Sequence, residues 1–80
     1  MNSPIAGVSL VVGIRQTIRA VEQNKVGRIY VANDAESRVV EPLIQLCKAK
    51  GVEVIFVDSR EALGKAAGIE RGASAIAVLR

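Results

Sequence analysis

Short, mostly apolar runs alternate along the chain with longer stretches in which apolar residues recur at helical spacing. The first run, residues 9–13, predicts a β-strand. Ile14, Ile18 and Val21 follow at i, i+4 and i+7, which places them on one face of a helix. Residues 28–33 are rich in β-branched side chains and predict a second strand. The first part of the chain is therefore expected to form strand, helix and strand.

The same alternation continues through the middle of the chain. Residues 34–40 predict a polar turn, and the apolar stripe after it predicts a helix from about Glu41. Pro42 fits the first turn of that helix, where a missing N–H is tolerated, and Gly51 is expected to end it. Residues 52–58 are nearly continuously apolar, as expected for a strand that is covered on both faces.

A short helix and a last strand complete the pattern. Asp58 and Glu61 have capping-box spacing, which predicts that a helix starts there, and Gly68 is expected to end it. Residues 73–79 predict a strand whose small side chains allow close helix packing. The order β-α-β-α-β-α-β predicts an α/β fold in which a sheet lies between helices, with room for a further short helix before residue 9.

Composition limits the size and the cellular setting. The chain has 80 residues, half of them hydrophobic, which is enough for one small domain over residues 1–80. A single cysteine cannot form an internal disulfide, and no apolar run is long enough to span a membrane. The N-terminal stretch lacks a basic leader region. We therefore expect a cytoplasmic protein with no membrane partner.

The residue types present argue against most catalytic chemistry. There is no histidine, so neither a zinc site nor the usual hydrolytic triad is expected. The strand–glycine–helix outline at Gly13 has only one glycine, which is too few for a dinucleotide-binding loop. Cys47 lies on the apolar stripe of a predicted helix, so a buried core thiol is favoured over a nucleophile. No catalytic residue, metal or cofactor is expected.

The start of the first predicted helix carries a distinctive polar set. Arg15 and Arg19 are i, i+4 neighbours on one face, with Gln16 beside them, directly after Gly13. Positive charge near a helix N-terminus opposes the helix dipole, which favours anions there. The arrangement makes sense if phosphate or nucleobase edges dock at this end, and the net charge of +3 suits an anionic partner. A solvated helix face without a ligand remains the alternative.

Three segments together resemble a known family. They are GIRQTIRAV, VANDAES and LGKAAGIERGASAIAV, in this order and spacing. They resemble the kink-turn RNA-binding ribosomal-protein family of the L7Ae/L30e type, and most of all its small stand-alone bacterial members. The resemblance covers residues 9–79. It implies a three-layer α-β-α sandwich around a four-stranded mixed sheet. The implied partner is a kink-turn, a sharply bent internal RNA loop with tandem sheared G·A pairs.

The resemblance also implies a set of RNA-binding residues. Gly13 matches the family glycine, Arg15 stands where most members have Asn, Gln16 where most have Glu, and Arg19 takes the Lys position. Gln16 can still bond guanine edges, whereas Arg15 favours phosphate. Asp34 fits a structural cap as well as an RNA contact. The implied set is Gly13, Ile14, Arg15, Gln16, Arg19, Asp34, Glu36, Val40, Arg60, Ile69, Glu70 and Arg71.

The expected function is therefore non-enzymatic recognition of structured RNA, ribosomal or regulatory, by a protein that is a monomer when free. Two alternatives follow from the same sequence. The first is an α/β protein-interaction or regulatory module without nucleic-acid binding, which would not need its arginines to share one surface. The second is a cysteine-dependent enzyme acting through Cys47, which would need an accessible thiol.

Overall fold

The computed structural model describes residues 9–80, and these form four strands and three helices in the expected order. The elements are β1 (Leu10–Val12), α1 (Ile14–Glu22), β2 (Val26–Ala32), α2 (Ser37–Lys50), β3 (Glu53–Val57), α3 (Arg60–Ala67) and β4 (Ala75–Leu79). The short helix considered before residue 9 lies outside the described residues. No helix within residues 9–80 combines the length and the apolar character that crossing a bilayer requires.

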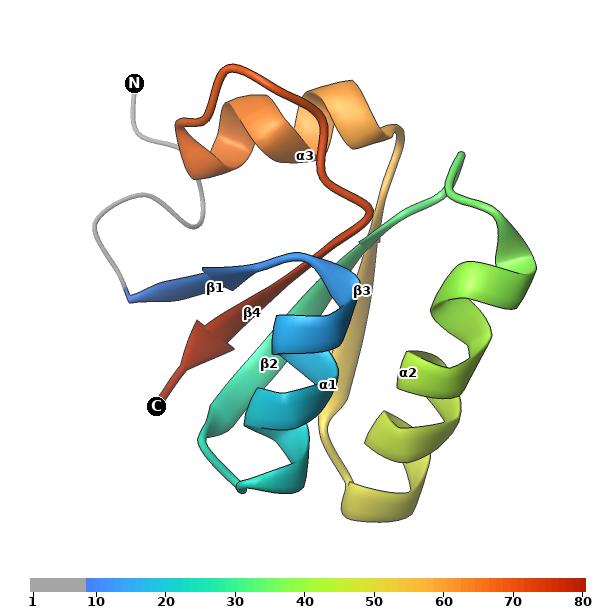
Figure 1. Ribbon diagram of the computed structural model, residues 1–80, viewed down its shortest axis with the longest axis vertical. Coiled ribbons are helices and arrows are strands. Elements are labelled where there is room, and N and C mark those ends of the chain that lie inside the picture. Colours follow the sequence, from blue (N-terminus) through green and yellow to red (C-terminus); the bar gives the residue numbers. More distant parts are fainter. Residues whose placement is uncertain (1–8) are drawn as a thin grey trace.

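The strands form one mixed sheet in the order β1-β4-β2-β3 (Figure 1). Strands β2 and β3 are parallel and are joined through α2, whereas β4 is antiparallel to both β1 and β2. The last strand of the chain therefore lies in the middle of the sheet, between β1 and β2. This insertion brings the loop before β4 next to the ends of β1 and β2.

Both faces of the sheet are packed against helices. Side chains alternate along β2, so Ile29 and Val31 belong to the core under α1 and α2, while Tyr30 and Ala32 belong to the core under α3. Strand β4 divides its side chains between the two cores in the same way. Figure 1 shows α1 and α2 on one side of the sheet and α3 on the other. The α-β-α sandwich expected from the family resemblance is thus confirmed.

Helix α2 begins about one turn earlier than the hydrophobic pattern predicts. It starts at Ser37 rather than near Glu41, so Pro42 lies inside the helix instead of in its first turn. The extra turn positions Val40 over the core, where it is 6% exposed beside Leu43. Full burial of a valine contributes about 1.5–3 kcal/mol, which offsets much of the cost of an interior proline.

The start of α3 also differs from the expectation. The capping residue is Ser59, whose hydroxyl oxygen accepts a hydrogen bond from the Ala62 N–H at 3.0 Å. Asp58 lies one residue too early to cap the helix, so the predicted Asp58–Glu61 capping box is wrong. Ser59 has the extended backbone of a helix cap, and its position three residues before Ala62 lets its hydroxyl reach that N–H.

Strand β3 is an edge strand, which the continuous apolar run did not predict. Val54 packs against one core and Ile55 against the other, so both faces of the strand are in contact with the protein. Phe56, however, is 55% exposed, and among the described strands β3 is paired on one side only. A continuous apolar run therefore marks a strand packed on both faces without requiring complete burial.

Candidate nucleic-acid interface

Gly13 links β1 to α1 in a backbone conformation that only glycine adopts easily. Its φ is 104°, and its N–H donates to the Ala75 carbonyl at 3.0 Å while its own carbonyl accepts from Thr17 at 2.9 Å. A Cβ here would also approach the Gln16 side-chain oxygen to 3.0 Å. The glycine therefore lets the chain leave the sheet and start a helix at once, with the Gln16 amide folded over the turn.

The beginning of α1 is an exposed site that lacks negative charge. Its first turn holds no acidic residue, and Gly13 has no side chain to cap the free N–H groups that every helix start presents. Arg15, Gln16 and Arg19 are exposed, whereas Thr17 is fully buried, with no hydrogen-bond partner for its hydroxyl in the described structure. Backbone N–H groups and Arg15 thus lie at the end where an anion would be stabilised, and Arg19 follows one turn later, in the last turn of α1.

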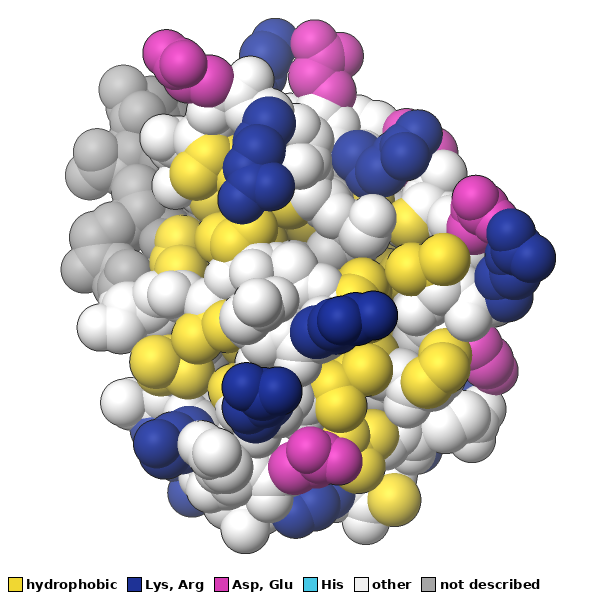
Figure 2. Space-filling view, viewed as in Figure 1, with side chains coloured by type: hydrophobic (Ala, Val, Ile, Leu, Met, Phe, Trp, Pro, Cys, Tyr) yellow, Lys and Arg dark blue, Asp and Glu magenta, His cyan; other side chains and the backbone are white. Residues whose placement is uncertain are grey.

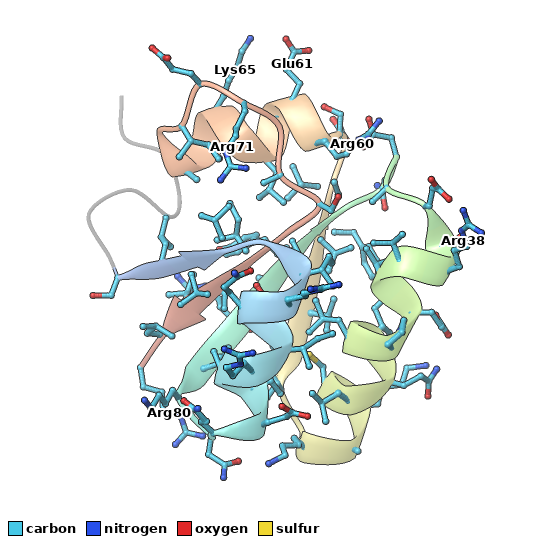
Figure 3. The ribbon with its side chains drawn as sticks, viewed as in Figure 1. Arg38, Arg60, Glu61, Lys65, Arg71 and Arg80 are labelled. Atoms are coloured by element: carbon cyan, nitrogen blue, oxygen red, sulfur yellow. The ribbon has the colours of Figure 1, made fainter. Side chains whose placement is uncertain are left out.

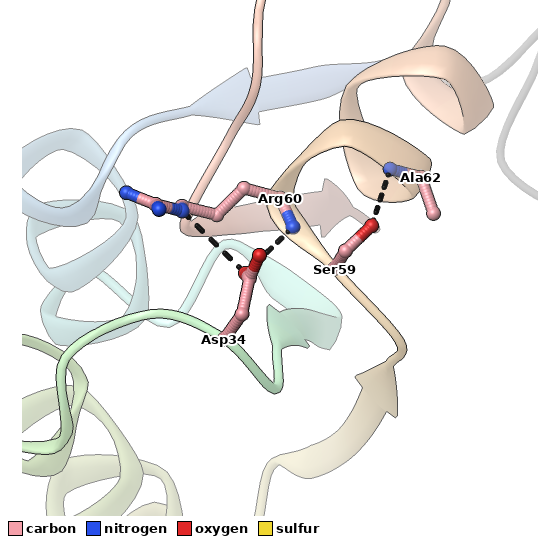
Figure 4. A network of polar contacts seen from close by, with 4 residues as sticks. All are labelled: Asp34, Ser59, Arg60 and Ala62. Carbon is pink, nitrogen blue, oxygen red and sulfur yellow. Dashed lines mark hydrogen bonds and ion pairs between the residues drawn. The ribbon is translucent and has the colours of Figure 1, made fainter.

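Asp34 joins the turn after β2 to the start of α3. Its Oδ1 accepts a hydrogen bond from the Arg60 backbone N–H at 2.8 Å and lies 3.4 Å from the Arg60 Nε (Figure 4). Both side chains are about half exposed, so the bond to the backbone matters more than the ion pair between the side chains. The carboxylate holds the two segments together and directs the Arg60 guanidinium over the turn.

The loop before β4 packs directly against α3. Gly68 ends that helix in the left-handed conformation, and the Ala73 N–H returns to the Arg60 carbonyl at 3.1 Å. A Cβ on Gly64 would overlap the Arg71 carbonyl oxygen, and one on Gly72 would lie 3.2 Å from the Arg60 Cβ. The sequence interpretation missed Gly64, although it stands in the segment that carried the resemblance.

Hydrogen bonds bring the three segments together at one end of the sheet. Gly13 is bonded to Ala75, Ala32 is bonded to Ser74 at 3.0 Å, and Asp34 reaches Arg60. In Figure 3, Arg60 and Arg71 lie on the two sides of the loop that leads into β4, above α1. The helix start, the turn after β2 and the 68–73 loop therefore form a continuous region, which we call the loop end.

Not every residue of the implied RNA-binding set offers a free side chain. Val40 is in the core, and Ile14 and Ile69 pack partly against the two cores. Gly13 contributes backbone. The exposed members are Arg15, Gln16, Arg19, Asp34, Glu36, Arg60, Glu70 and Arg71. Arginines and carboxylates are thus mixed at the loop end.

Ion pairing leaves only part of this charge free. Asp34 pairs with Arg60, and Glu36 pairs with Arg38 at 3.0 Å. Within residues 9–80, Arg15, Arg19 and Arg71 make no ion pair. Figure 2 shows Lys and Arg side chains spread over α1 and the loop before β4 on one face of the molecule. The arginines therefore lie on one surface. RNA binding requires this, whereas the alternative of a protein-interaction module does not.

The structure argues against the cysteine alternative. The Cys47 side chain is fully buried in the core between α1, α2 and the sheet, and burial raises the pKa of its thiol. A nucleophilic cysteine needs access and a lowered pKa, so Cys47 is a packing residue. In the part of the chain that the structure describes, no group of acidic or cysteine side chains could hold a metal ion, and no pocket is present.

Comparison with known proteins gives a consistent result. The model of the ribosomal protein L7Ae/L30e/S12e/Gadd45 family matches residues 5–80. The RNA-binding protein BH0128 of Halalkalibacterium halodurans is 44% identical over 86% of this chain and 84% of its own length. An RNA-binding protein of Bacillus pumilus is 41% identical over 89% of this chain and 87% of its own.

A solved structure extends this agreement to the fold. The 15.5kD RNA binding protein of Giardia lamblia superposes with a TM-score of 0.85 at 25% identity, covering 90% of this chain and 61% of that one. Because the family model matches nearly the whole chain, the protein belongs to the ribosomal protein L7Ae/L30e/S12e/Gadd45 family.

Proposed function

We propose that this protein binds RNA without catalysing a reaction, and that it recognises a kink-turn through the loop end. The observation that carries the proposal is the start of α1, where exposed Arg15 and Gln16 follow a positive-φ glycine with no acid in the first turn, and exposed Arg19 lies one turn further along. The relatives named as RNA-binding proteins support it. The family description supports a ribosomal or translation-associated role. We further propose that the protein is cytoplasmic and is a monomer when free.

Two kinds of contact with RNA contribute to binding at the loop end. Gln16 offers a donor and an acceptor at fixed spacing for a guanine edge, and the arginines neutralise phosphates. The major groove of straight A-form RNA is too deep and narrow for side chains to read. A sharp bend opens that groove, so a protein that inserts a helix start selects bent RNA by its shape.

The remaining residues line the edge of the same site. The internal loop of a kink-turn also holds a nucleotide that is flipped out of the helix. Arg60, held by Asp34, contacts the RNA backbone near that nucleotide, and Glu36 accepts hydrogen bonds from it. Residues 69–71 tune the choice of RNA from the opposite side. The positions of these segments around the start of α1 support this arrangement, because each can reach a different part of one bent RNA.

A gel-shift titration tests the proposal. The purified protein is titrated against a standard kink-turn hairpin and against a straight RNA duplex of similar length at one salt concentration. We expect binding to the kink-turn to be at least about tenfold tighter, the value of about one good base contact. Equal affinity for the two RNAs would exclude kink-turn recognition. Absence of binding to either RNA would favour the protein-interaction module.

A further inference from the structure

The net charge of the protein is concentrated far from the loop end. Of the eleven Lys and Arg residues and eight Asp and Glu residues, four cations and one carboxylate lie at the ends of α2 and β4 and from the last residue of α1 to the start of β2, with Arg19 one turn earlier in α1 not among them. They are Lys25, Lys48, Lys50, Arg80 and Glu22. Arg28 of β2 is paired with Glu53 of β3, so their opposite charges cancel in the sum. The rest of the chain holds six residues of each sign, so this basic end carries the whole net charge of +3.

Backbone and side-chain contacts make the basic end one continuous surface. The Arg80 N–H donates to the Lys25 carbonyl at 2.9 Å, and the Lys50 Nζ donates to the Asn24 Oδ1 at 3.0 Å. Lys48 lies in the last turn of α2, beside Lys50. Segments from four elements are thereby joined. Figure 3 places Arg80 at the lower edge of the molecule, opposite Arg60 and Arg71.

The cations of the basic end are not neutralised by carboxylates. The ion pairs of residues 9–80 involve Arg38, Arg60 and Lys65, which all lie outside this end. Lys50 donates to the Glu22 carbonyl at 3.2 Å and Arg80 donates to the Val26 carbonyl at 3.4 Å, both uncharged acceptors. Figure 2 shows the dark blue groups along the lower border of the molecule.

The helix dipole explains only part of this arrangement. Lys48 and Lys50 lie in the last turn of α2, where positive charge is favourable. Lys25 also follows a helix end, because its N–H donates to the Ala20 carbonyl of α1 at 3.1 Å. Arg80 instead follows strand β4, so no helix end accounts for it. Collecting Lys25 and Arg80 beside the lysines of α2 adds repulsion within the folded protein. Such a charge cluster is expected where a polyanion docks.

We propose that the basic end is a second RNA-binding surface, which contacts the phosphate backbone of an RNA duplex without reading its bases. It lies opposite the loop end along the longest dimension of the molecule, 33 Å. A protein whose loop end holds a kink-turn, as proposed above, then presents its basic end to another RNA segment. The two surfaces together would join RNA elements that are separate in sequence.

The chemistry of the basic end favours RNA over other polyanions. The exposed large hydrophobic residues of the described chain are Val39 and Phe56, and neither belongs to this end. Membrane docking through an interfacial surface uses apolar side chains as well as charge, and stable protein interfaces have an apolar centre. A surface of lysines and one arginine, with no exposed large apolar group, matches a regular array of phosphates instead.

The experiment measures capture of a duplex by protein that is already saturated with an unlabelled kink-turn hairpin. A fluorescent RNA duplex is then titrated, and its anisotropy gives the second dissociation constant. The test variant is Lys25→Glu, and the matched control is Lys65→Glu on the exposed face of α3. Both substitutions change the net charge equally. We expect Lys25→Glu to weaken capture about tenfold and the double variant Lys25→Glu/Lys48→Glu to weaken it further, with the control unchanged.

Each outcome of this experiment decides between explanations. Equal weakening in Lys25→Glu and Lys65→Glu would show a general charge effect and overturn the second surface. Duplex capture that none of the variants changes would also overturn the second surface. Binding of anionic phosphatidylglycerol vesicles or of a polyglutamate peptide, but not of the duplex, would overturn it as well. If the hairpin itself does not bind, the proposed function fails. The basic end is then tested on the duplex alone with the same variants, whose exposed positions preserve the fold.

Discussion

At the residue scale, Arg15 and Gln16 are neighbours with different chemistry at the start of α1. Both are exposed, and the Gln16 amide lies over Gly13. A planar amide can pair with a base edge, whereas a guanidinium pairs readily with phosphate oxygens. We therefore expect selectivity to depend on Gln16, and sequence-independent affinity to depend on Arg15.

Alanine substitution separates these two roles. Gln16→Ala should cost about 1–3 kcal/mol on a kink-turn and little on a straight duplex, because only the bent RNA presents the base edge. Arg15→Ala should weaken both RNAs by a similar factor. The measurement is a set of four dissociation constants at one salt concentration. A kink-turn-to-duplex ratio that survives Gln16→Ala would remove Gln16 as the reader.

A second prediction at this scale concerns Asp34, whose Oδ1 accepts the Arg60 backbone N–H. Asp34→Ala should lower the free energy of unfolding by about 1 kcal/mol, because a partly exposed hydrogen bond to a backbone group is lost. Asp34→Asn keeps an acceptor oxygen and should lose less. Urea unfolding of the two variants makes the comparison. Equal losses would mean that the negative charge, rather than the acceptor, holds Arg60.

Cys47 gives a prediction about pH. Because burial raises the pKa of its thiol, the pKa is higher in the folded than in the unfolded protein. The thiol therefore adds stability that is complete below its unfolded-state pKa and is lost as pH rises through the folded-state pKa. Urea unfolding across the alkaline range should show a decline that is smaller in Cys47→Val. An identical decline in both proteins would assign the effect to other groups.

At the scale of elements, the contact between α3 and the loop before β4 depends on Gly64. The Arg71 carbonyl occupies the space that a side chain at this position would need. The close approach keeps the 68–73 loop against α3 and so sets the position of Arg71 at the loop end. Helix packing and the shape of the candidate site are therefore linked through one glycine.

Substitution of Gly64 should affect both stability and binding. Gly64→Ala is expected to cost about 1–3 kcal/mol of stability because the loop must move away from the helix. Displacement of the loop should also weaken kink-turn binding about tenfold, or ~1.4 kcal/mol. Gly51→Ala is the matched control, because Gly51 has a φ of 70° and no heavy atom within 4 Å of the place that a Cβ would take. It should cost about 1–2 kcal/mol through backbone strain alone, with unchanged affinity.

Chemical denaturation and gel-shift titration of the two glycine variants give both quantities. Affinity is measured under conditions in which each variant is fully folded. If Gly64→Ala binds the kink-turn as the unsubstituted protein does, the loop does not contribute to recognition. Weakened binding by Gly51→Ala would mean that affinity follows stability rather than the geometry of the loop end.

At the scale of the whole molecule, free charge at the loop end sets the salt dependence of binding. Arg15, Arg19 and Arg71 make no ion pair among the described residues. About three phosphate contacts predict a slope near −3 for the logarithm of affinity against the logarithm of salt. Arg19→Ala should make the slope shallower by about one unit. Titrations of the kink-turn hairpin at several salt concentrations measure it, and an affinity independent of salt would contradict arginine–phosphate contacts.

The sequence by itself determined the elements and their order. The change from period 2 to helical spacing is a local property, so β1, α1 and the strands that follow were predictable within a few residues. Gly13, Gly51 and Gly68 marked boundaries because the backbone conformation there is a local requirement. The segments of the loop end were also identified from the sequence, through their resemblance to a family.

Only the tertiary structure decided how these local features combine. The early start of α2 depends on burying Val40 in the core that it shares with α1, and the bond from the Arg60 N–H to Asp34 joins the start of α3 to a turn that is distant in the chain. Because β4 lies between β1 and β2, the segments of the loop end lie close together. The residues of the basic end lie together because α1, α2 and β4 end on the same side of the molecule. Strand pairing, burial and charge clustering depend on contacts between residues that are distant in the chain, which periodicity and spacing do not encode.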